Sequence, residues 1–453
     1  MKETKFKQTE VGMIPSDWEA KTLGSISFVT KLAGFEFTSH VRYSDDGKII
    51  ALRGLNVRKG QLLLDDVKYI DNSNFSKLNR SKLFKKDLLF TYVGTVGNAA
   101  LVDKNNTYYL APNVALIRID EKNSPEYLMH LILSDYFFNN QIKTLMSTTS
   151  QAALSMTNIR LFLISLPPTI EEQQRIANAL SDVDTLIANL EKLIAKKKNI
   201  KQGAMQQLLT GRKRLPGFGS DERREMKKGN RHCEERSDAA IQSGYKMTEL
   251  GMIPSDWENT SLNKVVEFLN GDRGFNYPKD SDFCDLGIPF INAGHLKKSQ
   301  IDFTSMDYIT ESHYKKLGGA KIKKDDILFC LRGSLGKYAY VNFNDAAPAS
   351  SLCVLRSKRI CPKFLFQILG SDYIKKQIVD ANSGSSQPNL SAKDVGLFNI
   401  IMPSTIDEQS AIANILSDMD TEIATLETKL AKYRKLKTGM MQQLLTGKIR
   451  LIK

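Results

Sequence analysis

Basic and amide side chains gather in short, glycine-containing segments in both halves of the 453-residue chain. Arg and Asn can form paired hydrogen bonds with the edges of guanine and adenine, whereas Lys, Ser and Thr suit phosphate oxygens. These residue types predict a surface that contacts nucleic acid, although each segment taken alone could be an ordinary polar loop. The predicted contact residues are Arg53, Asn56, Arg58, Lys59, Lys77, Arg80, Lys82, Thr95 and Asn98 in the first half and Arg273, Asn292, His295, Lys297, Lys298, Arg332 and Ser334 in the second.

The charge balance agrees with a polyanionic partner. The formal net charge is +14, from 64 basic and 50 acidic side chains, and the isoelectric point is near 9.3. Such an excess favours nucleic acid, while the alternative is a solvated basic surface that only maintains solubility. Apolar runs stay well short of the ~18 residues of a membrane span, and the N-terminus lacks the apolar core of a signal peptide. Five cysteines without a Cys-x-x-Cys pair favour a reducing compartment, so we expect a cytoplasmic protein without a membrane partner.

Motifs for catalysis are missing from the sequence. The nearest approach to a phosphate-binding loop is the segment 333–337, but Leu331 stands where that loop needs glycine and Tyr338 follows the lysine. The five histidines form no His-x-x-x-His pair, so no metal site is expected. The only Pro-Pro dipeptide follows Leu166, which does not fit the adenine methyltransferase pattern. We therefore expect no catalytic residues and no cofactor in this chain.

The chain contains an internal repeat. Gly12–Trp18 and Gly251–Trp257 share the sequence Gly-Met-Ile-Pro-Ser-Asp-Trp, and Gln206–Gly211 and Gln442–Gly447 share Gln-Gln-Leu-Leu-Thr-Gly. Two copies of one unit in a polypeptide predict an internal pseudo-two-fold frame. The halves differ strongly between these segments, which suggests two unlike modules on one repeated frame.

Short β-rich runs precede a helical stretch in each half. Strands are predicted at 48–52, 87–93 and 114–119, and a helical stretch at 125–146. The predicted class is α+β: two mixed α/β domains separated by two long antiparallel coiled-coil helices. The predicted divisions are 1–168 for the first repeat segment and domain, 169–211 for the first long helix, 212–247 for a charged linker, 248–404 for the second repeat segment and domain, and 405–453 for the second long helix and tail.

A capping residue and a glycine delimit each long helix. Thr169 with Glu172, and Thr405 with Glu408, predict capping boxes at the starts, while Gly211 and Gly447 predict the ends. About 40 residues give a rod of ~60 Å. Apolar residues alternate in steps of four and three, which predicts a coiled-coil seam. The seam residues are Ile176, Leu180, Val183, Ile187, Leu190 and Ile194 in the first copy and Ile412, Leu416, Met419, Ile423, Leu426, Leu430 and Tyr433 in the second.

Lysines and glycines interrupt this seam. Lys197, Lys201 and Lys437 would weaken a simple pair of helices, fix its register, or lie outside the paired part. Gly203 and Gly439 occupy equivalent positions late in each helix, where glycine costs ~1 kcal/mol relative to alanine. Their duplication suggests close approach of another backbone or a bend.

The linker 212–247 mixes opposite charges densely and has few bulky apolar groups, so it is predicted to be flexible or weakly helical. Its length would let the second helix return antiparallel to the first. Thr149–Gln151 and Ser385–Gln387 occur in both halves, and segments that the halves share are expected to be structural or phosphate-facing rather than to read sequence.

Taken together, these motifs resemble those of the specificity subunits of type I restriction-modification systems. The resemblance rests on the Gly-Met-Ile-Pro-Ser-Asp-Trp segments, on the Gly94-x-x-Gly97 and Gly333-x-x-Gly336 turns, and on Glu171–Ala177 and 407–413, each leading to Gln-Gln-Leu-Leu-Thr-Gly. Ser386–Leu390 adds to it. The chain departs from the family pattern at Ala152–Leu154, which replaces Pro-Asn-Leu, and at Ser410-Ala411, which replaces a basic pair.

The resemblance implies that each α/β domain is a target recognition domain and reads one half of a split double-stranded DNA sequence. It also implies that two methyltransferase subunits, which hold S-adenosylmethionine, dock on the repeated helices, and that motor-nuclease restriction subunits complete the complex. The predicted docking residues are Gln206, Gln207, Leu208, Leu209, Gln442, Gln443, Leu444 and Leu445.

Two unlike readers on one frame predict an asymmetric target whose half-sites lie roughly one helical turn, ~34 Å, apart. Three alternatives stay open from the sequence. The chain could be a self-sufficient methyltransferase or nuclease, which the missing motifs oppose. It could be a coiled-coil adaptor that does not touch DNA, or an orphan specificity subunit without partners.

Overall fold

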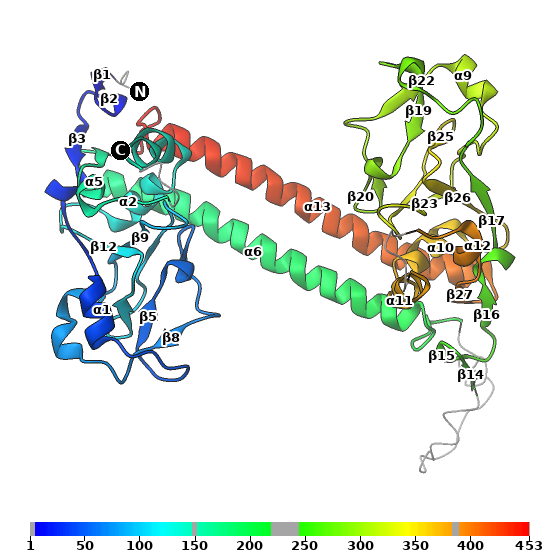
Figure 1. The fold of residues 1–453 in the computed structure, drawn as a ribbon, viewed down its shortest axis with the longest axis horizontal. Coiled ribbons are helices and arrows are strands. Elements are labelled where there is room, and N and C mark those ends of the chain that lie inside the picture. Colours follow the sequence, from blue (N-terminus) through cyan, green and yellow to red (C-terminus); the bar gives the residue numbers. More distant parts are fainter. Residues whose placement is uncertain (1–4, 147–151, 219–243, 383–388, 453) are drawn as a thin grey trace, which may run out of the picture. The chain divides into compact units, whose positions relative to one another are not determined.

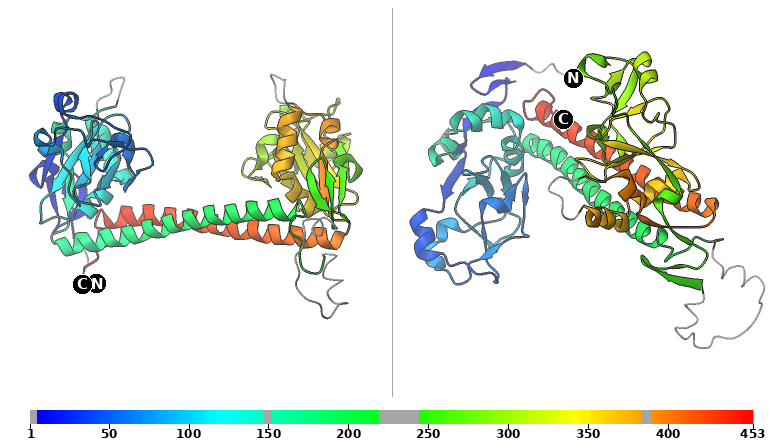
Figure 2. Two further views of the ribbon diagram at one scale, coloured as in Figure 1. Left: turned by 90° about the horizontal axis from the view of Figure 1, so that it is seen from below. Right: turned by 45° about the vertical axis from the view of Figure 1, so that its right-hand side comes forward.

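The computed structural model describes residues 5–146, 152–218, 244–382 and 389–452, which form two compact units (Figure 1). Unit 1 comprises residues 1–192 and 428–453, and unit 2 comprises residues 193–427. Both marked chain ends therefore belong to unit 1 (Figure 2). Across the described ranges, no helix has the length and apolar character needed to cross a membrane. The predicted segments 149–151 and 385–387 and most of the predicted linker lie outside the described residues.

In unit 1, four antiparallel strands form the main sheet, in the order β10-β9-β12-β4. A second sheet has the order β11-β5-β8, and hairpins or pairs join β1 with β2, β6 with β7, and β13 with β3. The strands are β1 (Phe6–Thr9), β2 (Gly12–Pro15), β3 (Glu19–Thr22), β4 (Ser27–Lys31), β5 (Ile50–Leu52), β6 (Val57–Arg58), β7 (Gln61–Leu62), β8 (Lys68–Tyr69), β9 (Leu88–Thr91), β10 (Ala99–Leu101), β11 (Tyr108–Leu110), β12 (Val114–Ile119) and β13 (Leu163–Leu166).

The helices of unit 1 before the long helix are short. They are α1 (Gly34–His40), α2 (Pro125–Ile132), α3 (Asp135–Phe137), the π-helical η5 (Phe138–Ile142), α4 (Lys143–Leu145) and α5 (Met156–Arg160), with 3-10 turns η1 (Leu23–Ser25), η2 (Gly54–Asn56), η3 (Phe75–Lys77) and η4 (Asn79–Ser81). The predicted helical stretch over 125–146 is confirmed, but it is divided after α2. Ser134 starts a new helix by accepting a hydrogen bond from the Phe137 amide at 3.1 Å, so the stretch breaks after α2.

Unit 2 repeats this topology. Its main sheet, β24-β23-β26-β17, corresponds strand for strand to that of unit 1, and its second sheet has the order β25-β19-β22-β18. The strands are β14 (Tyr245–Thr248), β15 (Gly251–Pro254), β16 (Glu258–Ser261), β17 (Val266–Asn270), β18 (Phe283–Cys284), β19 (Ile288–Ile291), β20 (Leu296–Lys297), β21 (Gln300–Ile301), β22 (Asp307–Ile309), β23 (Ile327–Cys330), β24 (Tyr338–Tyr340), β25 (Ala347–Pro348), β26 (Leu352–Ser357) and β27 (Asn399–Met402). Its shorter helices are α9 (Glu311–Lys316), α10 (Pro362–Leu369), α11 (Asp372–Ala381) and α12 (Ala392–Gly396), and its 3-10 turns are η7 (Leu262–Lys264), η8 (Asp280–Asp282) and η9 (Ala293–His295).

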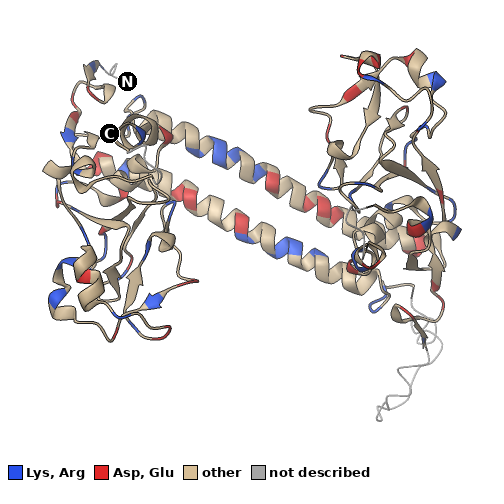
Figure 3. Ribbon diagram, viewed as in Figure 1, with Lys and Arg blue, Asp and Glu red and all other residues tan. Residues whose placement is uncertain are grey.

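The long helices α6 (Ile170–Leu208) and α13 (Ile406–Leu444) each contribute one part to each unit. Acidic residues lie mainly in the first half of each helix and basic residues in the second half (Figure 3). This polarity favours antiparallel pairing, because the acidic half of one helix meets the basic half of the other. In unit 1, Lys437 and Arg434 pair with Asp184 and Glu191 at 2.6 and 2.5 Å.

The seam lysines form ion pairs between the two long helices. In unit 2, Lys201 contacts Asp420 and Lys197 contacts Glu422, both at 2.6 Å. The pair Lys201–Asp420 is the repeat equivalent of Lys437–Asp184 in unit 1. Each pair joins α6 to α13, and of the three possibilities for the seam lysines these contacts support the one in which they set register.

The two helix glycines have open surroundings. An added Cβ at Gly203 or Gly439 would have nothing within 4 Å among the described residues. Both glycines lie inside uninterrupted helices. Close approach of another backbone is therefore not found among the described residues, and the expected bend stays a prediction.

Each unit is completed by the end of the long helix that starts in the other half of the sequence. In unit 1, Leu444 at the end of α13 and Leu445 directly after it are buried in the same core as Trp18. In unit 2, Leu208 at the end of α6 and Leu209 directly after it are buried with Trp257. The prediction that these four leucines are docking residues is wrong, because they are 0 to 6% exposed and hold their own unit together.

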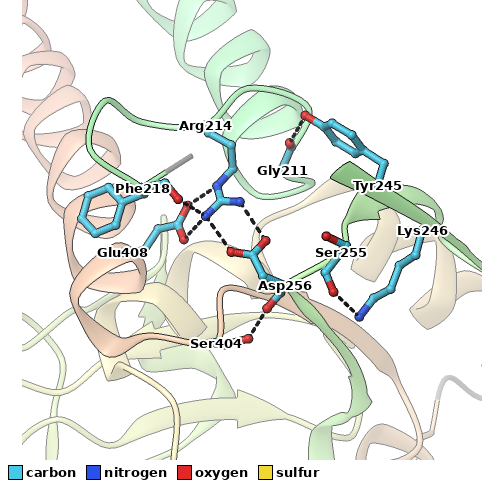
Figure 4. A network of polar contacts seen from close by, with 9 residues as sticks. All are labelled: Gly211, Arg214, Phe218, Tyr245, Lys246, Ser255, Asp256, Ser404 and Glu408. Carbon is cyan, nitrogen blue, oxygen red and sulfur yellow. Dashed lines mark hydrogen bonds and ion pairs between the residues drawn. The ribbon is translucent and has the colours of Figure 1, made fainter. Parts of the chain in front are cut away.

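An arginine whose side chain is largely buried, 15% exposed in Arg214 and 8% exposed in Arg450, joins the segments at each of these junctions. In unit 2, Arg214 donates to both oxygens of Glu408 at 2.6 and 2.7 Å and to Asp256 at 2.9 Å (Figure 4). In unit 1, Arg450 makes the same contacts with Glu172 and Asp17. As predicted, the Thr169 and Thr405 hydroxyls cap the long helices by accepting hydrogen bonds from the Glu172 and Glu408 amides, at 3.3 and 3.4 Å. The glutamates, however, are paired with arginine, so only half of each predicted capping box is confirmed.

Candidate nucleic-acid interface

Four loops of unit 1 enclose a groove of about 800 Å³. They are the α1 region, the η2–β6–β7 segment, the β9–β10 loop and the β11–β12 loop. The lining residues are Phe37, Tyr43, Arg53, Gly54, Leu55, Val57, Arg58, Lys59, Val93, Gly94, Thr95, Asn98, Pro112 and Asn113. Five predicted contact residues, Arg53, Arg58, Lys59, Thr95 and Asn98, are thereby brought together.

Backbone geometry holds two of these loops against one another. Lys59 has a positive φ of 44° at the β6–β7 turn, and its amide donates to the Asn98 side-chain oxygen at 3.3 Å. The next amide, Gly60, donates to the Ala99 carbonyl at 2.8 Å. Asn98 also donates to the Thr95 carbonyl at 3.2 Å. The side chains of Arg58 and Lys59 stay exposed at this fixed turn.

Arg53 already forms hydrogen bonds within the protein. Its Nη2 donates to the Asp66 carboxylate at 2.7 Å and to the Asp66 carbonyl at 2.9 Å. Its Nε is buried and has no hydrogen-bond partner among the described residues. Because this ion pair leaves other guanidinium N–H groups unused, Arg53 can donate a hydrogen bond to an acceptor in the groove.

The structure contradicts the prediction for Asn56 and His295. Asn56 is fully buried, accepts from the Arg53 amide and donates to the Leu63 and Asp66 carbonyls. His295 is its equivalent: it is 5% exposed, and its ring nitrogens contact the Asn292 amide and the Ser305 carbonyl. Both side chains hold the turn that carries the neighbouring basic residues, so they position the surface and do not form it.

Three further predicted residues lie outside the groove of unit 1. Lys77 ends η3, Arg80 lies in η4 and Lys82 follows it, and none of the three lines the groove. Arg80 donates to Thr30 Oγ1 at 3.0 Å, and Lys82 lies over the Phe84 ring at 5.6 Å. Contact of these three residues with nucleic acid stays a prediction.

Unit 2 places its predicted residues at the equivalent loops, with different chemistry. Asn292 replaces Arg53, Ser334 replaces Thr95 and Lys337 replaces Asn98. Lys297 and Lys298 occupy the turn of Arg58 and Lys59, and Lys298 again has a positive φ, of 50°. Arg332 and Ser334 are exposed on the β23–β24 loop. Lys337 was missed among the predicted contact residues, although the repeated Gly94-x-x-Gly97 and Gly333-x-x-Gly336 motifs already align it with Asn98.

Local carboxylates hold part of the unit 2 surface. Lys297 pairs with Asp302 at 2.6 Å, and Lys298 lies 3.5 Å from Glu427. The Lys297 ammonium and hydrogen bonds from Thr304 hold the pKa of Asp302 well below its usual range. Arg273 donates to the Ser350 carbonyl at 3.2 Å, and Asn292 donates to Asp307 at 3.1 Å. Exposed pairs of this kind are weak and can exchange for a polyanion.

Comparisons with known proteins agree with this arrangement. The family described as type I restriction modification DNA specificity domain matches residues 15–202 and 254–433. The MjaVIII specificity subunit of a type I restriction enzyme from Methanocaldococcus jannaschii is 26% identical over 99% of this chain and 97% of the relative. The EcoBI specificity subunit from Escherichia coli is 22% identical over 75% of this chain and 69% of the relative.

The fold also has counterparts among solved structures. The crystal structure of a type I restriction-modification S subunit from M. genitalium matches with a TM-score of 0.59 and 17% identity, covering 94% of this chain and 96% of that one. A structure from a study of complex assembly in the type I R-M system matches with a TM-score of 0.50 and 16% identity, covering 96% of this chain and 99% of that one.

Proposed function

Because the chain belongs to the type I restriction modification DNA specificity family, we propose that it reads a two-part, asymmetric DNA target through two unlike recognition surfaces while two identical methyltransferase subunits dock on its two units. Specificity subunits have a DNA-specificity role and are not themselves enzymes. S-adenosylmethionine and the chemistry belong to the methyltransferase partner, and motor-nuclease subunits complete the assembly in the cytoplasm.

The groove of unit 1 is the observation that carries the DNA-reading part. It gathers Arg53, Arg58 and Lys59 with two polar side chains at loops fixed by backbone hydrogen bonds. The equivalent loops of unit 2 carry Asn292 and Lys337 in place of Arg53 and Asn98. Equivalent positions that carry different hydrogen-bonding side chains support two half-sites of different sequence.

A methylome tests this part. The chain would be co-expressed with its methyltransferase subunit, and methylated adenines would be mapped genome-wide. We expect a split motif with one modified adenine in each half. Exchanging residues 19–168 for another recognition domain should change one half only. A change in both halves would contradict independent reading, and methyl transfer by the purified chain alone would favour an enzyme.

Salt dependence separates DNA binding from the adaptor alternative. Each phosphate contact adds about 0.9 to the slope of log affinity against log salt. Arg58→Ala and Lys59→Ala should each weaken binding of the assembled complex and lower that slope by up to about one. Lys264→Ala, an exposed-turn substitution in the other unit away from the groove, is the matched control. Salt-independent binding in the parent complex would support the adaptor.

Repeated grooves support the docking part of the proposal. In unit 2, a groove of about 620 Å³ is lined by Gln206, Thr210 and Asp372, among others. In unit 1, a groove of about 660 Å³ is lined by the equivalents Gln442, Thr446 and Asp135. Gln206 and Gln442 are exposed on the helix ends. One partner species therefore meets two similar surfaces, which suits two copies of one subunit.

Stoichiometry tests the docking. Native mass spectrometry of the parent chain should show two methyltransferase subunits. Gln206→Arg or Gln442→Arg should leave one, and the double variant none, because a long cation would fill the groove. Asn199→Arg is the matched control, since Asn199 is exposed on α6 and does not line the groove. Two bound subunits in the double variant would exclude docking at these grooves.

A further inference from the structure

One exposed aromatic ring in each unit lies in the segment that follows the equivalent strands β4 and β17: Phe35 in helix α1 and Phe275 in the loop before η8. The sequence Gly-Phe-x-aromatic occurs as Gly34–Phe37 in unit 1 and as Gly274–Tyr277 in unit 2. Phe35 is 70% exposed and Phe275 is 96% exposed. The two segments otherwise differ in sequence. They share a pair of aromatic residues, of which the first is exposed to solvent.

The second ring of each pair anchors the loop. Phe37 packs edge-on against Tyr43 with centroids 5.5 Å apart and lines the unit 1 groove. Tyr277 packs edge-on against Phe290 at 5.6 Å. The anchors fix where the exposed ring stands, two residues earlier in the chain.

Hydrogen bonds hold the unit 2 loop on both sides of Phe275. Asp272 accepts from the amides of Gly274 at 2.6 Å and Gly318 at 2.7 Å. Asn276 donates to the Lys316 carbonyl at 3.0 Å, and its own carbonyl lies 2.9 Å from His313 Nε2. A loop fixed in this way does not need an apolar tip for its own stability, and the exposed ring is unfavourable in water.

The neighbours of Phe275 indicate which kind of molecule covers it. Arg273 lies two residues before Phe275 and donates to the Ser350 carbonyl at 3.2 Å, between β25 and β26. Lys279 and Lys316 are exposed nearby, as is Lys315, which pairs with Glu311 at 2.7 Å. An apolar ring among cations fits a polyanion whose interior is aromatic, and a duplex of stacked bases has both properties.

We propose that Phe35 and Phe275 are wedges that enter the base stack of the two half-sites, one ring in each half. This inference rests on the proposed function. Insertion buries both faces of the ring, whereas contact with a thymine methyl group would bury one. A wedge also makes specificity depend on how easily a base step opens, at positions where no hydrogen bond is read.

The test uses the full chain assembled with its methyltransferase subunits. The probe is a 40-bp duplex that carries the motif mapped by methylation, with 2-aminopurine placed at one position at a time. Binding by the parent complex should raise 2-aminopurine fluorescence at one step in each half, because unstacking relieves its quenching. Phe275→Ala should abolish the fluorescence rise only in the half-site read by unit 2. It should also weaken binding about 10-fold, a loss in the range measured for base–aromatic stacking. Phe35→Ala should do so in the other half.

Leu286→Ala is the matched control, because Leu286 is 86% exposed in the same unit outside these loops. It should leave fluorescence and affinity unchanged. Parental fluorescence and affinity in Phe275→Ala would overturn the wedge. Weaker binding by the Phe275→Ala complex, together with no fluorescence rise in the parent complex, would also overturn the wedge. That result would point to contact with a thymine methyl group. Failure of the parent complex to bind the mapped duplex would instead remove the proposed function.

Discussion

Arg450 and Glu172 are 278 positions apart in the chain, yet they form a two-point ion pair in unit 1, with distances of 2.6 and 2.8 Å. Arg214 and Glu408 form the same pair in unit 2 across 194 positions. Each pair ties the segment after one long helix to the start of the other. Folding of either unit therefore requires both halves of the sequence.

Removing either arginine should destabilise its unit. In Arg450→Ala, Glu172 would stay buried, at 1% exposure, without its cation. Breaking a buried pair from one side costs about 3–5 kcal/mol, because the remaining charge is uncompensated. Urea unfolding should show this loss in unit 1, and Arg214→Ala should show it in unit 2.

Arg434→Ala provides the control for that loss. Its ion pair with Glu191 also joins the two long helices, but the side chains are 60% and 47% exposed. Exposed pairs contribute about 0–1 kcal/mol. Equal losses for Arg434→Ala and Arg450→Ala would contradict the distinction between a buried lock and a surface pair.

Glycine substitutions should have opposite effects at two kinds of site. Gly211 has φ of 69°, and an added Cβ would lie 2.4 Å from Pro254. Gly211→Ala should cost several kcal/mol through strain and overlap with the proline ring. Gly251→Ala, at φ of 104° with no atom within 4 Å, isolates the strain contribution and should cost about 1 kcal/mol. Thermal unfolding measures both.

In contrast, Gly203→Ala and Gly439→Ala should stabilise the free chain by up to about 1 kcal/mol each. Their Cβ positions are open and their helices are uninterrupted. A higher melting temperature for the double variant would check this. A lower one would indicate a packing role for these glycines that the free chain does not reveal.

Sequence patterns predicted what depends on local periodicity and repetition. The heptads gave α6 and α13, and the repeats gave two copies of one topology. The patterns failed where the partner of a residue is remote. Leu444 and Leu445 looked like a repeated docking surface because the sequence does not show that they pack with Trp18. Asn56 was predicted to contact a base, because its residue type does not show that the side-chain amide already forms hydrogen bonds within its own turn.

The seam ion pairs allow a charge-exchange experiment. Lys201→Glu should destabilise unit 2 by about 1–2 kcal/mol, because a carboxylate would face Asp420 in a half-buried position. Adding Asp420→Lys should restore most of that loss, and a double-mutant cycle would report the coupling. Lys437→Glu with Asp184→Lys is the same test in unit 1. Additive losses would show that these pairs do not set the register.

A buried histidine should make unit 1 sensitive to acid. His130 is 1% exposed; its Nε2 lies 3.0 Å from Ser181 Oγ, and its Nδ1 has no hydrogen-bond partner among the described residues. Burial lowers the pKa of His130 from 6.5 to about 4, although Asp184 and Glu126 oppose that shift and Lys437 adds to it. The folded unit therefore keeps the ring neutral while the unfolded chain takes up a proton.

The stability that depends on this neutral ring is complete above pH 6.5 and is lost as pH falls toward 4, by about 3 kcal/mol in total. Gln367 occupies the equivalent position in unit 2 and donates to Asp420 at 3.2 Å. His130→Gln should therefore preserve the fold and remove this part of the acid sensitivity. Urea midpoints for unit 1 at pH 7, 6, 5 and 4.5 should fall less steeply in the variant than in the parent chain. Parallel profiles would show that His130 is protonated in the folded unit and that its burial does not exclude the charge.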